Sequence, residues 1–397
     1  MTGIAVSWAG QVEIMLDPRQ SRRARKADIP DGHDNRSMRI VVAPDKFAGT
    51  ATASEAARAI AAGWSGIRPD DEVIVSPMAD GGPGTIDCVR GAGIGVVETH
   101  TTVDPLGRPV EARWLRIDGD TALVESAEAV GIHLIEPSRR DVSTSTSEGL
   151  GLLLSHLHQI GIRHLVVGLG GSATCDGGVG MAAALGIRFL RADGEPADLA
   201  PEHMGAIESV TGETPEFETV RIISDVTNPL LGPEGAPRAF GPQKGASPEQ
   251  IEAMEVALMQ LADRVEAGNQ SFRDRPGAGA AGGVGFALMA WLDGVMESGA
   301  TYVADVTGLS ARISSADLVI TGEGHIDRQS MHGKVPSHVL SLARAASVPV
   351  LAVAGRIDPD VAIEFATSVE LGDAGLIDPI GSMTAAGETA ASLASSI

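Results

Sequence analysis

The sequence predicts an α/β fold with two unlike lobes: a three-layer lobe of the Rossmann or flavodoxin type, and a mixed α/β lobe inserted into it. Length is the first reason, because 397 residues exceed what one ordinary hydrophobic core encloses. Short apolar runs also alternate with amphipathic helical patterns near both ends of the chain. We therefore expect residues 38–105 and 296–397 to form one discontinuous lobe and residues 106–295 to form the inserted lobe.

The first 37 residues show neither helical nor strand periodicity, so we expect residues 1–37 to be a disordered N-terminal extension. Their basic cluster follows a weakly apolar start, which is the reverse of the order in a signal peptide. Strand-like sequence begins at Arg39, which makes Met38 an alternative start of the chain.

Two strand, loop and helix units follow in the N-terminal part of the larger lobe. The first strand ends before Asp45 and Lys46, and the sequence TASE fits a capping box that begins the next helix. The second strand leads through the sequence MADGGPGT into a short helix. The expected strands are residues 39–43 and 72–76, and the expected first helix runs from about residue 52 to Trp64.

The middle of the chain has a different pattern. β-Branched residues broken by turns predict hairpin-like strands over residues 96–125. A capping box at residues 145–148 is expected to begin an amphipathic helix, and residues 163–169 are expected to form the next strand. Proline and glycine predict an irregular, functional loop over residues 225–245. Residues 318–354 then return to the strand and helix alternation.

Composition narrows the class of protein. A net charge of -22 makes nucleic acid and anionic membrane surfaces poor partners. No apolar run reaches the length needed to span a bilayer, so a cytoplasmic location is expected. Cys88 and Cys175 lack the spacing of a metal site, and we expect two buried, reduced thiols.

Four expected strands lead into loops that carry carboxylates, glycines and lysines. Ligands of open α/β sheets bind outside the carboxyl ends of the strands, so these loops can converge on one site. Glycine amides, lysines and carboxylates suit a nucleotide phosphate with its magnesium ion. Three of the lysines, Lys46, Lys244 and Lys334, lie in glycine- or proline-containing loops, where each can act as a point charge for phosphate oxygens. The loops are residues 45–46, 80–82, 170–178 and 321–334.

Other chemistries fit the motifs less well. Residues 168–173 match G-x-G-x-x-A after a strand, which is the pattern of a dinucleotide-binding turn. Polar residues and a double glycine at 174–178 separate this match from the next helix, whereas a dinucleotide-binding turn passes directly into one. The sequence has no P-loop of the form G-x-x-x-x-G-K-[ST] and no G-x-S-x-G elbow.

In combination, several motifs of this chain resemble the bacterial glycerate kinase family of the first type, from about residue 38 to the C-terminus. The resemblance implies an ATP-dependent kinase of D-glycerate with two unlike α/β lobes and an active site in the cleft between them. Of the two products, it favours 2-phosphoglycerate over 3-phosphoglycerate. The motifs are APDKF (43–47), PMADGG (77–82), GGSAT (170–174), NPL (228–230), FGPQKGA (240–246), residues 276–283 and TGEG (321–324).

On this reading we predict catalytic, nucleotide, metal and substrate contacts. The catalytic residues are Lys46, Asp80, Asp176, Lys244 and Glu323. Contacts to ATP are assigned to Gly81, Gly82, Gly170, Gly171, Ser172, Gly279, Gly282, Gly322 and Lys334. The Mg²⁺ candidates are Asp80, Asp176, Asp225 and Glu323, and the substrate contacts are Asp45, Lys46, Asn228 and Gln243.

Two positions depart from the family. Pro83 stands where the family often has Glu, and Cys175 stands where it often has Asn. These changes leave open a kinase of another small hydroxy acid, and the loop from Gly168 to Ala173 leaves an NAD-binding oxidoreductase as a weaker alternative. The expected partners are glycerate and ATP, with a homodimer left open.

Overall fold

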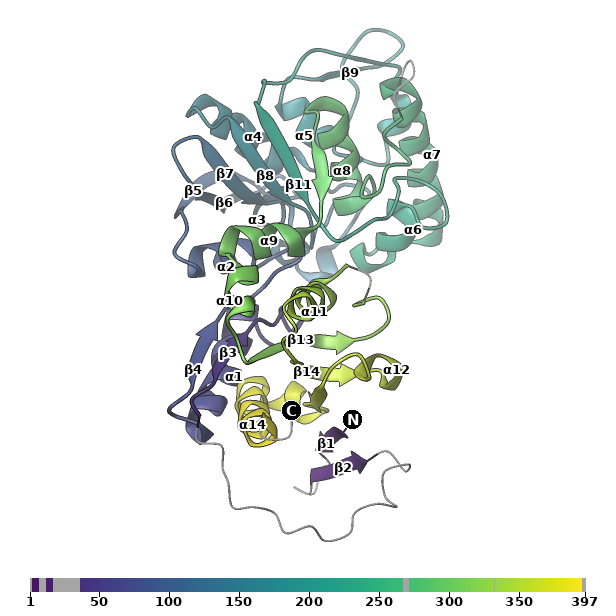
Figure 1. The fold of residues 1–397 in the computed structure, drawn as a ribbon. Helices are drawn as coiled ribbons and strands as arrows, with labels where there is room; N and C mark the ends of the chain where they lie inside the picture. The colour runs from purple at the N-terminus through teal and green to yellow at the C-terminus, as the bar shows by residue number, and fades with distance from the viewer. Residues whose placement is uncertain (1, 7–11, 17–35, 267–270, 332, 395–397) are drawn as a thin grey trace, which may run out of the picture. The chain divides into compact units, whose positions relative to one another are not determined.

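The computed structural model describes residues 2–6, 12–16, 36–266, 271–331 and 333–394. The chain divides into two compact units. The first unit comprises Met1–Asp80, Asp87–Ala92 and Ala300–Ile397, and the second comprises Gly81–Ile86 and Gly93–Gly299. Strands and helices interleave in both units, which confirms the predicted α/β class (Figure 1).

A seven-stranded sheet forms the centre of the first unit, in the order β2-β1-β15-β14-β13-β3-β4. All neighbouring strands are parallel except β1 and β2, which pair antiparallel. Strand β3, the first three residues of β13 and most of β14 are apolar, as expected of strands buried on both faces. The bounds are β1 (Thr2–Val6), β2 (Val12–Leu16), β3 (Arg39–Val42), β4 (Glu72–Val75), β13 (Leu318–Ile326), β14 (Val350–Ile357) and β15 (Thr367–Glu370).

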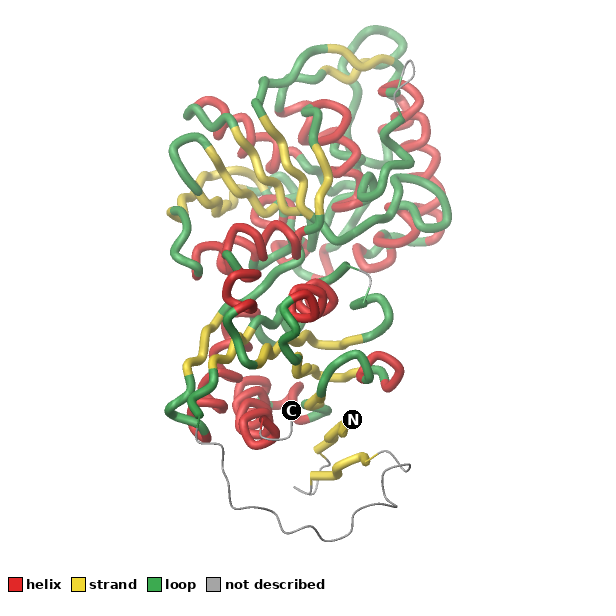
Figure 2. The backbone as a smooth tube through the Cα atoms, in the orientation of Figure 1, coloured by secondary structure: helices red, strands yellow, loops and turns green. Residues whose placement is uncertain are grey.

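Helices cover both faces of this sheet (Figures 1 and 2). Helix α1 (Ala53–Ile67) begins at the predicted capping box of Thr52 and Glu55 and packs along α14 (Pro379–Leu393). Apolar residues of α1, α14 and the sheet form one buried core. The other helices are α2 (Thr85–Gly91), α9 (Gly299–Thr307), α10 (Leu309–Ser314), α11 (Val335–Ala345), α12 (Pro359–Ala362) and α13 (Ala374–Ile377).

The second unit contains a six-stranded sheet in the order β12-β11-β8-β7-β6-β5. Strands β12, β11, β8 and β7 are parallel, whereas β6 and β5 continue the sheet antiparallel as a hairpin. The bounds are β5 (Val96–Val103), β6 (Pro109–Arg116), β7 (Thr121–Glu125), β8 (His164–Gly168), β11 (Thr219–Ile223) and β12 (Val295–Glu297), with a separate pair β9 (Arg188–Leu190) and β10 (Ser209–Thr211).

Helices and short 3-10 turns of the second unit pack around one large apolar core. The segment predicted as an irregular loop contains helix α6 and a 3-10 turn that ends at Lys244. The helices are α3 (Ala127–Val130), α4 (Glu148–Gln159), α5 (Val179–Ala184), α6 (Ala236–Phe240), α7 (Pro248–Val265) and α8 (Ala280–Trp291). The 3-10 turns are η1 (Ile132–Leu134), η2 (Pro137–Arg139), η3 (Met204–Ala206) and η4 (Pro242–Lys244).

Three details differ from the sequence analysis. Residues 1–37 were expected to lack regular structure, but β1 and β2 lie in this range, and β1 pairs with the edge of β15. Residues 7–11 and 17–35 of that extension lie outside the described residues. Strand β5 pairs with β6 and so belongs to the second unit, not to the lobe of residues 38–105. Helix α4 begins at Glu148 without a capping box, because its N-cap Ser147 uses its hydroxyl elsewhere.

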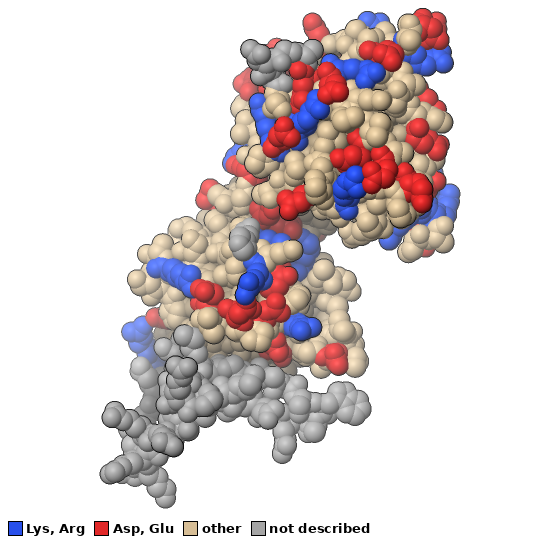
Figure 3. Space-filling model, turned by 90° about the vertical axis from the view of Figure 1, so that its right-hand side faces the viewer, with Lys and Arg blue, Asp and Glu red and all other residues tan. Residues whose placement is uncertain are grey.

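Acidic and basic side chains are interspersed on the face that Figure 3 shows. Exposed ion pairs such as Arg238 with Glu252, 2.7 Å apart, therefore form between neighbouring surface residues. Pairs of this kind contribute little to stability. In the part of the chain that the structure describes, none of the helices combines the length and the hydropathy of a membrane span.

A close contact between α1 and α14 gives a test of this packing. A Cβ added at Gly63 would lie 1.9 Å from the carbonyl oxygen of Thr384, so we expect Gly63→Ala to destabilise the protein by about 3 kcal/mol. Gly66→Ala in the same helix meets nothing within 4 Å and should stabilise by about 0.5–1 kcal/mol. Urea unfolding of both variants measures the difference. Equal stability of the two would contradict the contact.

Candidate functional site

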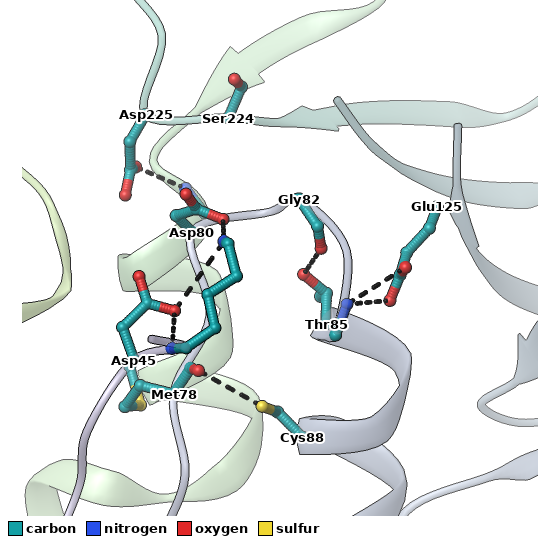
Figure 4. A network of polar contacts seen from close by, with 12 residues as sticks. Asp45, Met78, Asp80, Gly82, Thr85, Cys88, Glu125, Ser224 and Asp225 are labelled. Atoms are coloured by element: carbon teal, nitrogen blue, oxygen red, sulfur yellow. Dashed lines mark hydrogen bonds and ion pairs between the residues drawn. The ribbon is translucent and has the colours of Figure 1, made fainter. Parts of the chain in front are cut away.

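One polar cluster of the first unit lies at the carboxyl ends of β3, β4 and β13. Lys46 follows β3, and its Nζ donates a hydrogen bond of 2.8 Å to Oδ1 of Asp80, which follows β4. The same Nζ lies 3.9 Å from Oδ1 of Asp45. Figure 4 shows Asp45 and Asp80 pointing toward the ammonium group that lies between them. The sequence-predicted residues Asp45, Lys46 and Asp80 are therefore brought together.

Burial makes the ionisation of this cluster unusual. Asp45 is only 4% exposed, and burial raises its pKa to about 7 although Lys46 acts in the opposite direction. Asp80 and Glu323 add to the rise because they are further negative charges. Burial opposes the charge of Lys46, but Asp80 and Asp45 raise its pKa above the ordinary value. The cluster thus joins a firmly protonated cation to a carboxylate that titrates near neutrality.

Glu323 contributes from strand β13. Burial raises its pKa, and its Oε1 is buried without a hydrogen-bond partner among the described residues. Lys334, the N-cap residue of α11, and Ser330 both lower that pKa, so they also act on the Glu323 carboxylate. Gly322 lies directly before it, and a Cβ there would be 1.8 Å from the Val353 carbonyl oxygen. The glycine lets β13 lie close to β14.

The second unit holds a buried lysine in a small pocket. Lys244 is 5% exposed, and its Nζ donates to Oγ of Ser172 at 2.9 Å and to the Thr174 carbonyl oxygen at 2.5 Å. Burial lowers the pKa of this ammonium group. The pocket has a volume of about 80 Å³ and brings together the predicted residues Gly170, Gly171, Ser172, Gln243 and Lys244.

Asp176 lies two residues after Thr174, but its side chain does not line the Lys244 pocket. Its side chain is fully buried, and burial raises its pKa although hydrogen bonds to the carboxylate act in the opposite direction. Oδ2 accepts from the N–H and hydroxyl of Ser147 at 2.8 and 2.7 Å, and Oδ1 accepts from the N–H of Gly178 at 3.0 Å. The N–H of Gly180 adds a bond of 3.3 Å to Oδ2. These bonds tie the start of α4 to the start of α5.

Glycines bring two loops of the second unit into backbone contact. A Cβ at Gly168 would lie 2.3 Å from the Gly81 carbonyl oxygen, and a Cβ at Gly170 would lie 2.8 Å from Cα of Gly82. The predicted phosphate-loop glycines therefore pack against each other, which only residues without a side chain can do. One of these loops also lines the Lys244 pocket.

Glu125 is a residue that the sequence analysis missed. It ends strand β7, is 2% exposed, and accepts hydrogen bonds from the N–H groups of Ile86 at 2.6 Å and Gly84 at 3.1 Å. Figure 4 shows the Glu125 carboxylate pointing at the segment before Thr85. Burial raises its pKa to about 7. A glutamate that closes an apolar strand was the available signal.

The remaining predicted residues are held by loop contacts. The Asn228 side-chain amide donates to the Glu234 carbonyl oxygen at 2.7 Å, and its own carbonyl accepts from Gly279 at 2.9 Å. Gly282 has a φ of 71°, a conformation that favours glycine. Asp225 accepts from the Gly299 N–H at 2.9 Å. These residues hold the backbone, and none of them lines the Lys244 pocket.

The two departures from the family lie in the second unit, where Pro83 is half-buried and Cys175 is buried. Pro83 lies against Gly171, where an added Cβ would meet its Cγ at 3.0 Å. Cys175 is fully buried, and burial raises its thiol pKa to about 11. Both predicted free thiols are confirmed, and Cys88 donates to the Met78 carbonyl oxygen at 3.3 Å (Figure 4).

Comparison with known proteins decides the family. The profile of the glycerate kinase family matches residues 40–391. The chain belongs to the glycerate kinase family. A glycerate 2-kinase of Escherichia coli K12 is 40% identical over 332 residues, which cover 82% of this chain and 87% of that protein.

Further members of the glycerate kinase family agree. A glycerate kinase of Bacillus subtilis 168 is 39% identical over 330 residues, covering 81% of this chain and 86% of that protein. A crystal structure assigned to glycerate kinase 2 of Salmonella typhimurium LT2 has a TM-score of 0.77 and 37% identity. It covers 91% of this chain and 98% of the solved chain, and so supports the mixed α/β fold over almost the whole length.

The dinucleotide-binding pattern lacks its structural context in this kinase family member. Strand β8 ends at Gly168, and the next helix, α5, begins only at Val179. A dinucleotide-binding turn passes directly from the strand into a helix whose N-terminus holds the pyrophosphate. This geometry gives the oxidoreductase alternative no support.

Some of the predicted carboxylates suit a Mg²⁺ ion better than others. Over the described residues, no group of three or more His, Cys, Asp or Glu side chains is arranged to hold a metal ion. Kinases usually bind Mg²⁺ through one or two carboxylates together with substrate phosphates and water. The buried, unbonded Oε1 of Glu323 fits such a partial site, whereas the oxygens of Asp176 already accept protein hydrogen bonds.

Replacing Asp176 tests whether its role is structural. In Asp176→Asn, one acceptor becomes an NH₂ group that faces N–H and hydroxyl donors, so we expect a loss of about 2 to 4 kcal/mol in unfolding free energy. Urea unfolding gives the value. The exposed Asp120→Asn is the control and should change stability by less than about 0.5 kcal/mol. Unchanged stability of Asp176→Asn would contradict the hydrogen-bonded arrangement.

The raised pKa of Glu125 predicts a pH dependence. Its pKa rises from 4.5 to about 7 on folding, so the native state binds a proton that the unfolded state has released. The corresponding stability is present below the unfolded pKa and is lost as pH rises through 7. Because Glu125→Gln stays neutral, it should gain on the order of 3 kcal/mol relative to the wild type between about pH 4 and pH 8.

The measurement compares urea midpoints of the two proteins across this pH range. Asp45 titrates in the same pH range, but it does so in both proteins, so its effect on stability cancels in the difference between them. A constant difference at all pH values would show that Glu125 does not titrate there.

Proposed function

We propose that this protein transfers the γ-phosphoryl group of ATP to D-glycerate and forms 2-phosphoglycerate rather than 3-phosphoglycerate. The observation that carries the proposal is membership of the glycerate kinase family over residues 40–391. The relative from Escherichia coli is a glycerate 2-kinase, which favours transfer to the 2-hydroxyl. The role in the cell would be the phosphorylation of an organic acid.

The polar clusters supply what phosphoryl transfer requires. The reaction needs neutralisation of the phosphate charge, alignment of the acceptor and a group that accepts the hydroxyl proton. Lys46 and Lys334 can act as point charges for phosphate oxygens. A base works best with a pKa near the working pH, and Asp45, with a pKa of about 7, meets that condition.

The family's use of ATP implies a divalent cation, for which Mg²⁺ is the proposed ion. Glu323 would hold it because its Oε1 is buried without a hydrogen bond, and Asp80 would be the second carboxylate. When bound, the ion would neutralise charge on the β- and γ-phosphates. Lys46, which donates to Asp80, would keep that carboxylate in place.

A kinase of another small hydroxy acid is a second candidate function. Pro83 favours it, because a ring stands where the family often has a carboxylate, and this ring lies against Gly171 of the Lys244 pocket. The reaction would be the same and only the acceptor would differ.

Formation of ADP in the presence of different acids tests the proposal. We expect ADP to form with ATP, Mg²⁺ and D-glycerate, and not when the acid is omitted or replaced by L-glycerate. ADP formation with a different hydroxy acid alone would favour the second candidate function. ADP formation that does not depend on any added acid would contradict both.

Lys46→Met tests the cluster of the first unit. Removal of the ammonium leaves Asp45 and Asp80 without their cation, and we expect kcat to fall by about 100-fold or more. Glu364→Gln, which removes one side of an exposed ion pair with Arg344, is the control and should keep wild-type kcat. Wild-type turnover in Lys46→Met would remove this cluster from the reaction.

A further inference from the structure

The Lys244 ammonium group is buried without a direct ion pair among the described residues, and Asp176 acts on its charge only from a longer distance. Within the described residues, no carboxylate oxygen lies within 4.0 Å of its Nζ, and its bonds go to the neutral Ser172 hydroxyl and Thr174 carbonyl. A buried charge without a partner is costly, so proteins keep such a group where a ligand completes it. The ammonium lines an open pocket, which gives an anion access to it.

Backbone donors surround the same pocket. Gly170 and Gly171 line it, and no described residue accepts a hydrogen bond from either N–H group. Gly171 has a φ of 63°, and successive N–H groups around a left-handed residue form concavities that bind anions. The lysine, amide and hydroxyl donors together form a site that suits negatively charged oxygen atoms.

Size and lining limit what the anion can be. The pocket volume of about 80 Å³ leaves room for the carboxylate end of a small organic acid. Apolar side chains form much of its wall, which suits a carboxylate attached to carbon atoms. These side chains are Ile132, Leu169, Val226 and Phe240.

The cluster of the first unit has the opposite character. Asp45, Asp80 and Glu323 contribute three carboxyl groups there, against Lys46 and the more distant Lys334. Such a cluster repels the carboxylate of an acid and suits a phosphate accompanied by a metal cation. The phosphate of ATP therefore suits the Lys46 cluster, whereas the carboxylate of the acid suits the Lys244 pocket.

We propose that the Lys244 pocket binds the carboxylate group of the acid substrate, with Lys244, Ser172 and the Gly170 and Gly171 amides as donors. The inference rests on the kinase function proposed above and assigns the substrate subsite within it. It differs from the sequence analysis, which gave Gly170, Gly171 and Ser172 to ATP.

Lysine NMR of the wild-type protein tests the assignment without any mutation. The chain has only four lysines, so selective ¹³C labelling gives four Cε signals. D-Glycerate and D-lactate should shift the Lys244 signal and raise its apparent pKa, because both carry the carboxylate. Glycerol, which lacks the carboxylate, should leave the signal unchanged. Movement of this signal with MgATP or inorganic phosphate, and not with D-glycerate, would overturn the assignment.

Kinetics of two variants of Lys244 provide an independent readout. Each variant also lacks one of the four lysine Cε signals, and the missing signal is that of Lys244. In Lys244→Met we expect the KM for D-glycerate to rise by about 100-fold and the KM for ATP to change by less than about threefold. Lys244→Arg keeps the charge and should recover part of the loss. A rise in the KM for ATP alone would overturn the assignment. Thermal melting checks folding, and the wild-type NMR decides the question if Lys244→Met does not fold.

The two proposals can fail separately. Phosphorylation of D-glycerate together with an unmoved Lys244 signal would overturn the subsite and leave the kinase function standing. Binding of D-glycerate at Lys244 without any phosphoryl transfer would support the subsite and contradict the kinase function.

Discussion

Close backbone contact between glycines is the constraint on which the second unit depends. Strand β8 ends at Gly168, and from there the chain runs against the segment from Gly81 to Pro83, with Gly170 facing Gly82. A side chain at Gly168 or Gly170 would force these loops apart, since an added Cβ would lie within 2.8 Å of the other backbone. Gly170 and Gly171 also line the pocket, so the same contact positions its N–H donors.

Three charged groups of the candidate site are balanced in different ways. Lys46 joins Asp80 in a direct ion pair. Asp176 has no cation within ion-pair distance among the described residues and is satisfied by hydroxyl and N–H donors. Lys244 has only neutral hydrogen-bond acceptors, and Asp176 acts on its charge from beyond ion-pair distance. The difference follows from local structure, because N–H groups at helix starts can neutralise a carboxylate but cannot neutralise an ammonium group.

Much of the fold could be predicted from the sequence because its signals are local. Thr52 and Glu55 mark the start of α1, and the apolar runs at β3 and β13 mark buried parallel strands. The turns between residues 96 and 125 predicted the hairpin of β5 and β6, but not that β5 belongs to the second unit, because this depends on the pairing of β6 with β7. The sequence STSE imitates a capping box, but Ser147 donates to Asp176, a residue 29 positions away.

The candidate site shows the same limit. Residue type and position at strand ends were enough to select Lys46, Asp80 and Lys244. Whether a carboxylate is accessible is a tertiary property, so the sequence gave Asp176 and Glu323 equal weight although only Glu323 keeps a buried oxygen without a hydrogen bond. Glu125 was missed because its partners, Gly84 and Ile86, lie about 40 residues earlier in the chain.

Phosphorus NMR of the reaction product tests the central claim most directly. The purified protein is incubated with ATP, Mg²⁺ and D-glycerate, and the product is compared with standards of 2- and 3-phosphoglycerate. The account predicts a new phosphomonoester resonance that coincides with 2-phosphoglycerate and is absent without the acid. A resonance of 3-phosphoglycerate would contradict the proposed position of transfer, and an ATP signal that does not respond to D-glycerate would contradict the function itself.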